Sequence, residues 1–347
     1  MTKIVLDTFG ADRGVSVVVE GAVDALEKYP EVTLVLVGDS DIINAELSKY
    51  KYDTERIIVE DAKETITNEE SPTVAIRAKK NSSLVRALEI TKADPEVVGM
   101  VSAGSTGAVL SGGIFKVGRI KGVLRPALCP VLPTLPGGRV CLVDCGANMD
   151  CKPEYLAQFA LMGVEYMKSL GIENPRVGLV SVGVEDKKGN DLTHAVFKML
   201  KKMPINFVGN MESREALSGD YDVLVTDGFV GNVLLKSIEG TAKMMSTLLK
   251  REIKASTRAK IGYALFMKGA MNNFKASMDY HAFGGAVFVG VEKIIVKSHG
   301  SSKASSITAS VGQVVQMNSL NFITNIKQAI ASVDVKALLD ESEEKND

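Results

Sequence analysis

The chain has 347 residues, of which 46% are hydrophobic and 24% charged, as expected of a soluble globular protein whose core needs no disulfide bonds. Its formal net charge is −1, tryptophan is absent and aromatic residues make up 5%, so neither bulk charge nor base stacking favours a nucleic-acid partner. No signal peptide and no apolar run of about 18 residues is visible, and we expect a cytoplasmic protein with reduced cysteines.

Near-continuous apolar runs alternate with helical patterns along the chain. Helical patterns occupy 14–29, 41–49 and 71–92, and strand patterns occupy 3–7, 32–39, 56–61, 96–104, 138–146, 176–183, 205–210, 221–228 and 293–297. Such runs are typical of parallel strands that are buried on both faces. Their alternation with helices predicts an α/β fold with a doubly wound sheet.

Small and polar residues cluster where seven of these strands end. The clusters occupy 7–14, 102–108, 144–150, 182–190, 209–215, 227–232 and 299–303. The carboxyl ends of parallel strands form one edge of a sheet, where glycine N–H groups and helix N-termini can hold an anion. We therefore expect a phosphate-binding rim, although any single cluster could serve only as a turn and helix cap.

Standard nucleotide and hydrolase motifs do not fit the sequence. It contains no G-x-G-x-x-G and no G-x-S-x-G, and the glycine spacing at 113–120 lacks the lysine and hydroxyl residue of a P-loop. His194, His281 and His299 are scattered, which argues against a serine triad. His299 is the best placed of them, because glycine and two serines follow it at a predicted helix start.

The four cysteines do not have the spacing of a metal site or a redox pair. They are Cys129, Cys141, Cys145 and Cys151. None forms a C-x-x-C motif and no histidine lies near them, so we expect neither a metal nor another cofactor.

Six segments, in this order, resemble the bacterial phosphate acyltransferase family of phospholipid synthesis. They are "SAGSTGA" (102–108), "GRIKGVLRPAL" (118–128), "DCGANMDCKPEYLAQFALMG" (144–163), "EDKKGN" (185–190), "DGFVGNVLLKSIEG" (227–240) and "VKSHGSSK" (296–303). The resemblance extends over about residues 3–330. That family converts acyl-acyl carrier protein and inorganic phosphate into acyl phosphate and free carrier.

This resemblance implies a three-layer α/β/α sandwich with a mostly parallel sheet, like that of isocitrate and isopropylmalate dehydrogenases and phosphotransacetylase, and a protruding helical hairpin. It also implies a homodimer that contacts the membrane peripherally, with acyl carrier protein, inorganic phosphate and a downstream glycerol-3-phosphate acyltransferase as partners. We expect one catalytic domain over 1–333 that includes a helical tip at 241–280, and a disordered acidic tail over 334–347.

The resemblance also implies the site residues. The family's lysine and asparagine fall on Lys188 and Asn232, for which we predict catalytic roles, although spacing alone would allow Lys188 to be a solvated loop residue. Hydroxyl, amide and backbone N–H donors of the neighbouring clusters are the predicted phosphate and substrate ligands. They are Ser102, Gly104, Ser105, Thr106, Asn148, Asp227, Gly228, His299, Gly300, Ser301 and Ser302.

The sequence departs from the family pattern at three places. The first loop has Thr8, Phe9 and Ala11 where the family has alanine, methionine and glycine. Ser105 stands in place of asparagine and Phe283 in place of tyrosine. Because Ser105 can still donate a hydrogen bond, we expect the chemistry to be retained.

Residues 250–275 contain seven basic residues and one acidic residue, Glu252. Apolar residues recur there at helical spacing, and Leu265 and Phe266 widen the apolar stripe. A basic helix with an apolar face suits a membrane surface or an acidic carrier, or else an ordinary core or dimer helix. We predict membrane or carrier contacts for five residues: Lys254, Arg258, Lys260, Leu265 and Phe266.

Two rival functions stay open at this point. One is a coenzyme A-dependent phosphate acyltransferase of the phosphotransacetylase type, and the other is a membrane-binding scaffold without catalysis. A decarboxylating dehydrogenase would share the fold class, but the sequence has no matching cofactor signature.

Overall fold

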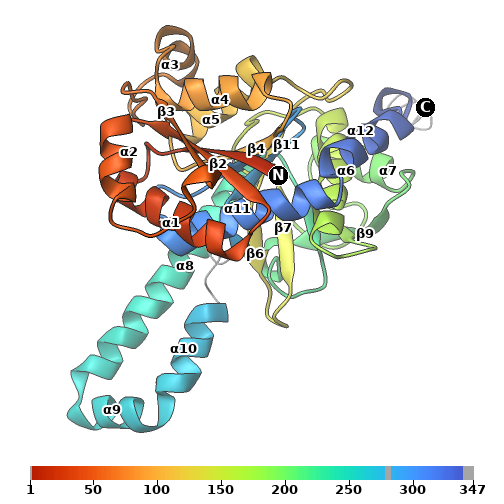
Figure 1. Ribbon diagram of the computed structural model, residues 1–347. Coiled ribbons are helices and arrows are strands. Elements are labelled where there is room, and N and C mark those ends of the chain that lie inside the picture. The colour runs from red at the N-terminus through yellow and green to blue at the C-terminus, as the bar shows by residue number, and fades with distance from the viewer. Residues whose placement is uncertain (1, 278–282, 339–347) are drawn as a thin grey trace.

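The computed structural model describes residues 2–277 and 283–338 (Figure 1). His281 and most of the predicted acidic tail, 339–347, lie outside the described residues. The expectation of a disordered tail therefore stays a prediction.

Seven strands form the first sheet, in the order β3-β2-β1-β4-β12-β11-β5. Their bounds are β1 Thr2–Asp7, β2 Val32–Gly38, β3 Ile57–Asp61, β4 Val97–Ser102, β5 Ala127–Cys129, β11 Ala286–Val289 and β12 Ile294–Lys297. The neighbours from β3 to β12 pair in parallel, whereas β11 is antiparallel to both β12 and β5. The carboxyl ends of β1, β4 and β12 therefore meet at one edge.

Successive residues of these strands pack against opposite faces of the sheet. Ile4 belongs to a core cluster with α1 (Val15–Lys28) and α11 (Ala304–Ser319), whereas Val5 belongs to a second cluster with α4 (Ser83–Ala93). Helices cover both faces, as Figure 1 shows. The expected three-layer α/β/α fold is confirmed.

Five strands form a second sheet, in the order β6-β7-β10-β8-β9. Their bounds are β6 Val131–Pro133, β7 Arg139–Val143, β8 Arg176–Ser181, β9 Asn206–Glu212 and β10 Val223–Val225. Only β6, which pairs with β7, is antiparallel among them. On one side α6 (Pro153–Ser169) and α7 (Asp191–Leu200) bury their apolar faces, and on the other side lies the beginning of α8 (Gly228–Ala255).

The segment 127–133 connects the two sheets. Its first part, β5, pairs with β11, and its second part, β6, pairs with β7. Backbone hydrogen bonds from Leu142 to Pro130 (3.1 Å) and from Cys145 to Leu128 (3.0 Å) attach β7 to the same segment. The structure thus has two sheets where the sequence predicts one. The strands β5, β6 and β11 are short and antiparallel and lack the long apolar runs of the other strands, so the sequence pattern does not reveal them.

The remaining helices connect the strands. They are α2 Ser40–Leu47, α3 Pro72–Ala78, α5 Thr106–Gly112, the π-helical turn η2 Gly113–Val117, α12 Phe322–Ser332, and the short turns η1 Thr54–Arg56 and η3 Ser213–Glu215. The prediction of one helix over 71–92 is wrong, since α3 and α4 are separate. Ser82 is the N-cap of α4, and its hydroxyl accepts a hydrogen bond from the backbone N–H of Val85.

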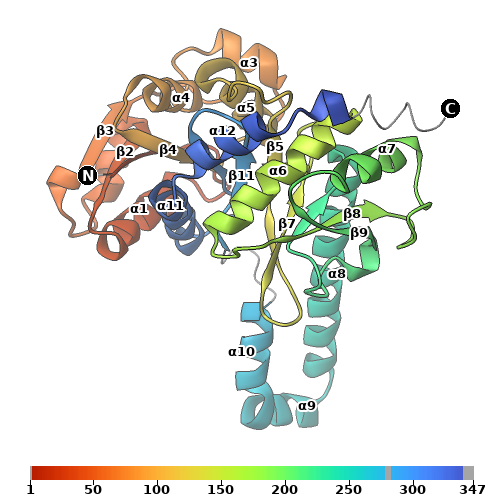
Figure 2. The ribbon, with the colours of Figure 1, turned by 90° about the vertical axis from the view of Figure 1, so that its right-hand side faces the viewer.

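A pair of helices extends from the body of the molecule (Figures 1 and 2). It consists of the second half of α8, then α9 (Thr257–Gly262), the π-helical turn η4 (Tyr263–Met267) and α10 (Lys268–Ser277). The described part of the predicted helical tip, 241–277, therefore continues directly from the helix that begins at the rim cluster 227–232, and residues 278–280 of that prediction lie outside the described residues. No helix among the described residues has the length and apolarity that a membrane-crossing segment requires.

Candidate active site

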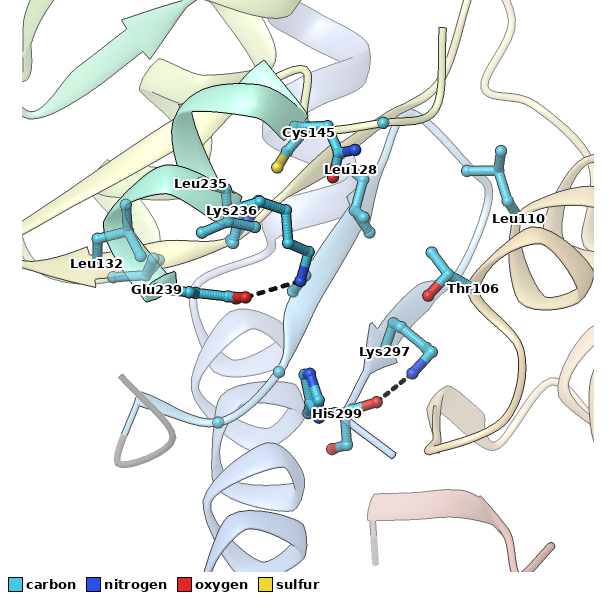
Figure 3. A pocket seen from close by; sticks show the side chains of 18 of the residues that line it. Thr106, Leu110, Leu128, Leu132, Cys145, Leu235, Lys236, Glu239, Lys297 and His299 are labelled. Atoms are coloured by element: carbon cyan, nitrogen blue, oxygen red, sulfur yellow. Dashed lines mark hydrogen bonds and ion pairs between the residues drawn. The ribbon is translucent and has the colours of Figure 1, made fainter. Parts of the chain in front are cut away.

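A cavity of about 350 Å³ lies where the two sheets meet (Figure 3). Six parts of the chain contribute to its wall: α5, the segment 127–133, the loop after β7, α8, the residues before β11 and the end of β12. The lining residues are Thr106, Gly107, Leu110, Leu128, Pro130, Val131, Leu132, Cys145, Gly146, Met149, Asn232, Leu235, Lys236, Glu239, Phe283, Gly284, Gly285, Ala286, Lys297, Ser298 and His299.

The wall of this cavity combines apolar and polar side chains. Figure 3 shows Leu132, Leu235 and the ion pair of Lys236 with Glu239 on one side of the cavity, and Leu110, Thr106, Lys297 and His299 on the other. An apolar surface suits a hydrocarbon chain, and cationic and hydroxyl groups suit an anion. The cavity can therefore receive a molecule with one apolar part and one anionic part.

One face of α8 supplies Asn232, Leu235, Lys236 and Glu239 to the cavity. Their spacing of three, four and seven residues places them on the same side of a helix. The helix begins at Asp227, whose carboxylate accepts a 2.8 Å hydrogen bond from the backbone N–H of Val230. Lys236 Nζ and Glu239 Oε2 are 2.7 Å apart, so that this lysine already has a carboxylate partner.

Asp144 organises the loop that follows β7. Its carboxylate accepts hydrogen bonds from the backbone N–H groups of Leu128 (2.9 Å), Cys145 (2.7 Å), Ala147 (3.0 Å) and Asn148 (2.6 Å). Burial raises the pKa of Asp144, and the hydrogen bonds from Leu128 and Asn148 oppose that shift. A buried carboxylate therefore holds Gly146, which lines the cavity with φ 106°.

The cysteine side chains do not have the properties of nucleophiles or metal ligands. Cys145 lines the cavity, but burial raises the pKa of its thiol to about 12, so it stays protonated at neutral pH. Burial raises the pKa of Cys151 to about 12 as well. Among the residues that the structure describes, no group of three histidine, cysteine or acidic side chains is placed to hold a metal ion.

Asp7, Ser102 and Lys297 form a row across the first sheet. Ser102 at the end of β4 pairs in register with Asp7 on one side and with Lys297 on the other. Asp7 accepts hydrogen bonds from the Ser102 hydroxyl (2.7 Å), the Ser83 hydroxyl (2.7 Å) and the backbone N–H of Phe9 (3.3 Å). The row places one buried acid and one buried base two strands apart.

Burial shifts the pKa values of both ionisable residues in this row. It raises the pKa of Asp7 to about 6, against the effect of the hydrogen bonds from Ser102 and Ser83. It lowers the pKa of Lys297 to about 8, against the attraction of Asp7 and Asp12. Lys297 is therefore still mainly cationic at neutral pH.

Three of the predicted site residues line the cavity: Thr106, Asn232 and His299. They come from α5, α8 and the loop after β12, which are far apart in the sequence. Three separate rim clusters thus contribute residues to one cavity, and the predicted roles of these residues stay predictions.

Other predicted ligands use their polar groups within the protein. Ser102 is fully buried and donates to Asp7, and its hydroxyl accepts a 3.1 Å hydrogen bond from the N–H of Gly104. Asn148 Nδ2 donates to the carbonyl of Pro126 (2.8 Å) and to Asp144 (3.0 Å). These residues shape the rim instead of lining the cavity.

Asp227, Gly228 and Ser105 begin helices beside the cavity. Gly228 follows the cap residue Asp227, and its N–H donates a 2.8 Å hydrogen bond to the carbonyl of Asn148. Ser105 precedes α5 without a side-chain capping bond. None of the three belongs to the cavity lining, although Thr106, the next residue after Ser105, does.

The cluster 299–303 forms hydrogen bonds within itself and with the first loop. Ser301 N–H donates to His299 Nδ1 (3.1 Å), and the carbonyl of Gly300 accepts from Asp12 N–H (2.7 Å). Ser302 is buried, and its hydroxyl has no hydrogen-bond partner among the described residues. Of this cluster, only His299 lines the cavity.

Lys188 lies in the exposed loop after β8. Its backbone carbonyl accepts a 3.2 Å hydrogen bond from the Ser181 hydroxyl, and its side chain lies against Gly183. β8 is separated from β7 by β10, and Lys188 does not line the cavity. Its predicted catalytic role stays a prediction.

The sequence did not single out several residues that the cavity contains. Lys236 and Glu239 could have been found from their helical spacing to Asn232. Lys297 could have been found as a lysine that ends an apolar strand directly before a polar cluster. The apolar lining has no such signal, because its leucines resemble ordinary core residues.

Comparisons with known proteins agree with this fold. A family model described as "Fatty acid synthesis protein" matches residues 2–325. The phosphate acyltransferase of Clostridium perfringens (strain SM101 / Type A) is 47% identical over 330 residues, which cover 94% of this chain and 96% of that protein. The phosphate acyltransferase of Clostridioides difficile (strain 630) is 43% identical and covers 95% of this chain and 96% of its own.

Solved structures with low sequence identity share the architecture. A phosphotransacetylase from Streptococcus pyogenes has a TM-score of 0.57 at 16% identity, over 95% of this chain and 94% of that chain. A branched-chain phosphotransacylase from Enterococcus faecalis V583 has a TM-score of 0.56 at 15% identity, over 91% and 98%.

At 15–16% identity, the similarity to these solved structures shows the fold alone. The class of protein follows from the sequence relatives. The chain is an acyltransferase. It belongs to the phosphate acyltransferase family, since the family model and relatives above 40% identity both extend over nearly its whole length.

Proposed function

We propose that this chain transfers a fatty acyl group from acyl carrier protein to inorganic phosphate, and thereby forms acyl phosphate for the synthesis of phosphatidic acid and phospholipids. The observation that carries the proposal is the cavity between the sheets, whose wall combines leucine side chains with lysine and threonine side chains. Its leucines would contact the acyl chain next to the thioester, and its lysines and hydroxyl groups would bind phosphate.

The reaction needs little covalent help from the protein. An oxygen of hydrogenphosphate attacks the thioester carbonyl, a C–O bond forms, and the C–S bond then breaks. The proton of hydrogenphosphate ends on the carrier thiol, so that neither a redox partner nor a metal is needed for balance. The site has to place the phosphate oxygen about 3 Å from the carbonyl carbon and stabilise the oxyanion that develops.

Two residues of the cavity and one residue outside its lining are candidates for these tasks. Asn232 can donate a hydrogen bond to the oxyanion without adding charge, and Thr106 can donate through its hydroxyl. Lys188, whose role rests on the family resemblance, would neutralise phosphate or the oxyanion from the loop after β8. Cys145 competes with neither, because its thiol stays protonated.

The helical tip supports a second part of the proposal, which is peripheral contact with a membrane; the proposed homodimer rests on the family resemblance. Leu265 is 69% exposed and Phe266 83% exposed, at the far end of the extended helices. Lys254, Arg258 and Lys260 lie nearby in the same segment, where they would favour anionic lipid or an acidic carrier. A downstream glycerol-3-phosphate acyltransferase would then receive acyl phosphate at the membrane.

The test is a comparison of acyl donors with purified protein and inorganic phosphate. We expect phosphate-dependent loss of a long-chain thioester from acyl carrier protein, with kcat/KM at least about tenfold above that for the same acyl group on coenzyme A. A preference for coenzyme A would instead support the phosphotransacetylase-type reaction. Absence of any phosphate-dependent turnover would leave only the scaffold function.

A further inference from the structure

The two lysines that line the cavity have different surroundings. Lys236 lies on α8, is 56% exposed and forms an ion pair with Glu239. Lys297 ends β12 inside the first sheet and is only 9% exposed. No carboxylate of the described residues lies within ion-pair distance of its ammonium group.

The Lys297 ammonium is held in place by backbone carbonyls. Nζ donates a hydrogen bond to the carbonyl of Ala103 (3.4 Å) and another to the carbonyl of Ser298. Ser298 is itself buried and fixed by a 2.7 Å hydrogen bond between its hydroxyl and that of Ser310. An ammonium group has three N–H donors, and the described residues supply no partner for the third.

The nearest acid in the same row does not neutralise this charge directly. Asp7 lies two strands away, with Ser102 in register between them. Its carboxylate is already bonded to Ser102, Ser83 and Phe9. Burial of a cation with no anionic partner is unfavourable, and a site that keeps one is suited to an anionic ligand.

We propose that Lys297 is a direct phosphate ligand, whose ammonium group lines the cavity and binds an oxygen of inorganic phosphate. This inference rests on the proposed function, because it assigns a substrate ligand to the same site. Phosphate bound there would lie beside Thr106 and His299. Lys297 would compensate the phosphate charge throughout the reaction, and Asn232 would be left to act on the acyl carbonyl.

The first experiment measures binding of inorganic phosphate by calorimetry, without any acyl donor. Lys297→Met removes the charge and keeps a side chain of similar length. We expect its Kd for phosphate to rise roughly 10- to 100-fold, as for the loss of one charge-assisted hydrogen bond. An unchanged Kd in a folded Lys297→Met protein would overturn the proposal.

Lys293→Met is the matched control. Lys293 lies just before β12, is partly buried and also donates to backbone carbonyls, those of Asp94 and Val97, but it does not line the cavity. Its replacement should leave the Kd for phosphate within about twofold of wild type. A similar loss in both variants would show a general effect on the sheet and would contradict a direct contact by Lys297.

Steady-state kinetics separate a ligand from a merely structural residue. Lys297→Met should raise the KM for phosphate and leave the KM for the acyl donor near its wild-type value. A rise in the KM for the acyl donor alone would count against the proposal.

A crystal structure of the wild-type protein soaked in phosphate tests the proposal even if Lys297→Met does not fold. We expect a phosphate oxygen about 2.7–2.9 Å from Lys297 Nζ. Phosphate bound elsewhere in the cavity, beyond hydrogen-bond distance from Nζ, would overturn the assignment. Failure of the proposed function has a different signature, which is phosphate binding at Lys297 without phosphate-dependent turnover of any acyl thioester.

Discussion

The hydroxyl of Ser102 donates a 2.7 Å hydrogen bond to the carboxylate of Asp7, and both groups are buried in the same row of the first sheet as Lys297. Ser102 was predicted as a phosphate ligand, but its hydroxyl is used to bind this carboxylate. The pair affects the stability of the sheet, because burial disfavours the charged form of Asp7.

The buried Asp7 should make stability depend on pH in the acidic range. Its pKa is raised from an ordinary value of 3.8 to about 6, so its contribution to the free energy of unfolding is complete below about pH 4 and is lost as pH rises through about 6. That contribution is on the order of 3 kcal/mol. Denaturant unfolding should show that the free energy of unfolding of wild type falls by this amount, relative to that of Asp7→Asn, as the pH rises from about 4 to above 6.

Lys297, with its pKa lowered to about 8, titrates above this pH window and does not contribute to the pH dependence of stability within it. If the stability difference between wild type and Asp7→Asn is independent of pH between about 4 and 7, the carboxyl group does not titrate as its burial requires.

Asp144 should be essential for the shape of the rim. Asp144→Asn leaves one carbonyl oxygen for four backbone N–H groups and places an amide N–H₂ against other donors. We expect a loss of at least about 2 kcal/mol in the free energy of unfolding and lower turnover. Asp150→Asn, an exposed change in the same loop, should alter stability by less than about 0.5 kcal/mol. Equal stability of the two variants would contradict this role.

Asn232 is expected to act in the transition state. Asn232→Ala should lower kcat by about 10²-fold with little change in thermal stability, as when one oxyanion donor is removed. Ser237→Ala, an exposed position of the same helix outside the cavity lining, should behave like wild type. Near-wild-type turnover of Asn232→Ala would remove it from the reaction.

Lys188→Ala provides a separate test of the family resemblance, with an expected loss of about 10²- to 10³-fold in kcat. The exposed loop contributes little to the core, so the variant should fold normally. If Lys188→Ala has wild-type activity while Asn232→Ala does not, the cavity is the site and Lys188 lies outside it.

The tip of the extended helices is predicted to touch anionic membranes. Leu265→Glu with Phe266→Glu should weaken sedimentation with anionic vesicles and leave turnover of soluble substrate intact. Val74→Glu is a matched control, because Val74 is 63% exposed on α3, at the opposite end of the molecule from α9 in Figure 1. If the double variant still sediments like wild type, the apolar stripe has another use.

Much of the fold follows from the sequence alone. The continuous apolar runs at 3–7 and 32–39 correspond to β1 and β2, and the segment 14–29, whose apolar residues recur at helical spacing, corresponds to α1. β5 and β11 could not be found in the same way. They are three and four residues long, and their pairing joins Cys129 to Val287, a relationship that no local pattern contains.

The candidate site was predictable as a rim but not as a cavity. Thr106, Asn232 and His299, which belong to the predicted glycine and polar clusters, line the cavity. Which clusters face one another depends on strand order, and β10 lies between β7 and β8, the strand that leads to the Lys188 loop. The burial of Lys297 likewise depends on its neighbours β4 and β11, which come from distant parts of the chain.

The measurement that tests the central claim most directly uses oxygen-labelled inorganic phosphate, long-chain acyl carrier protein and the purified wild-type chain, with product analysis by mass spectrometry. Attack by a phosphate oxygen on the thioester predicts acyl phosphate that retains all of the phosphate-derived label, together with an equal amount of free carrier thiol. Release of unlabelled fatty acid by hydrolysis, or carrier thiol formed at the same rate without phosphate, would contradict the account.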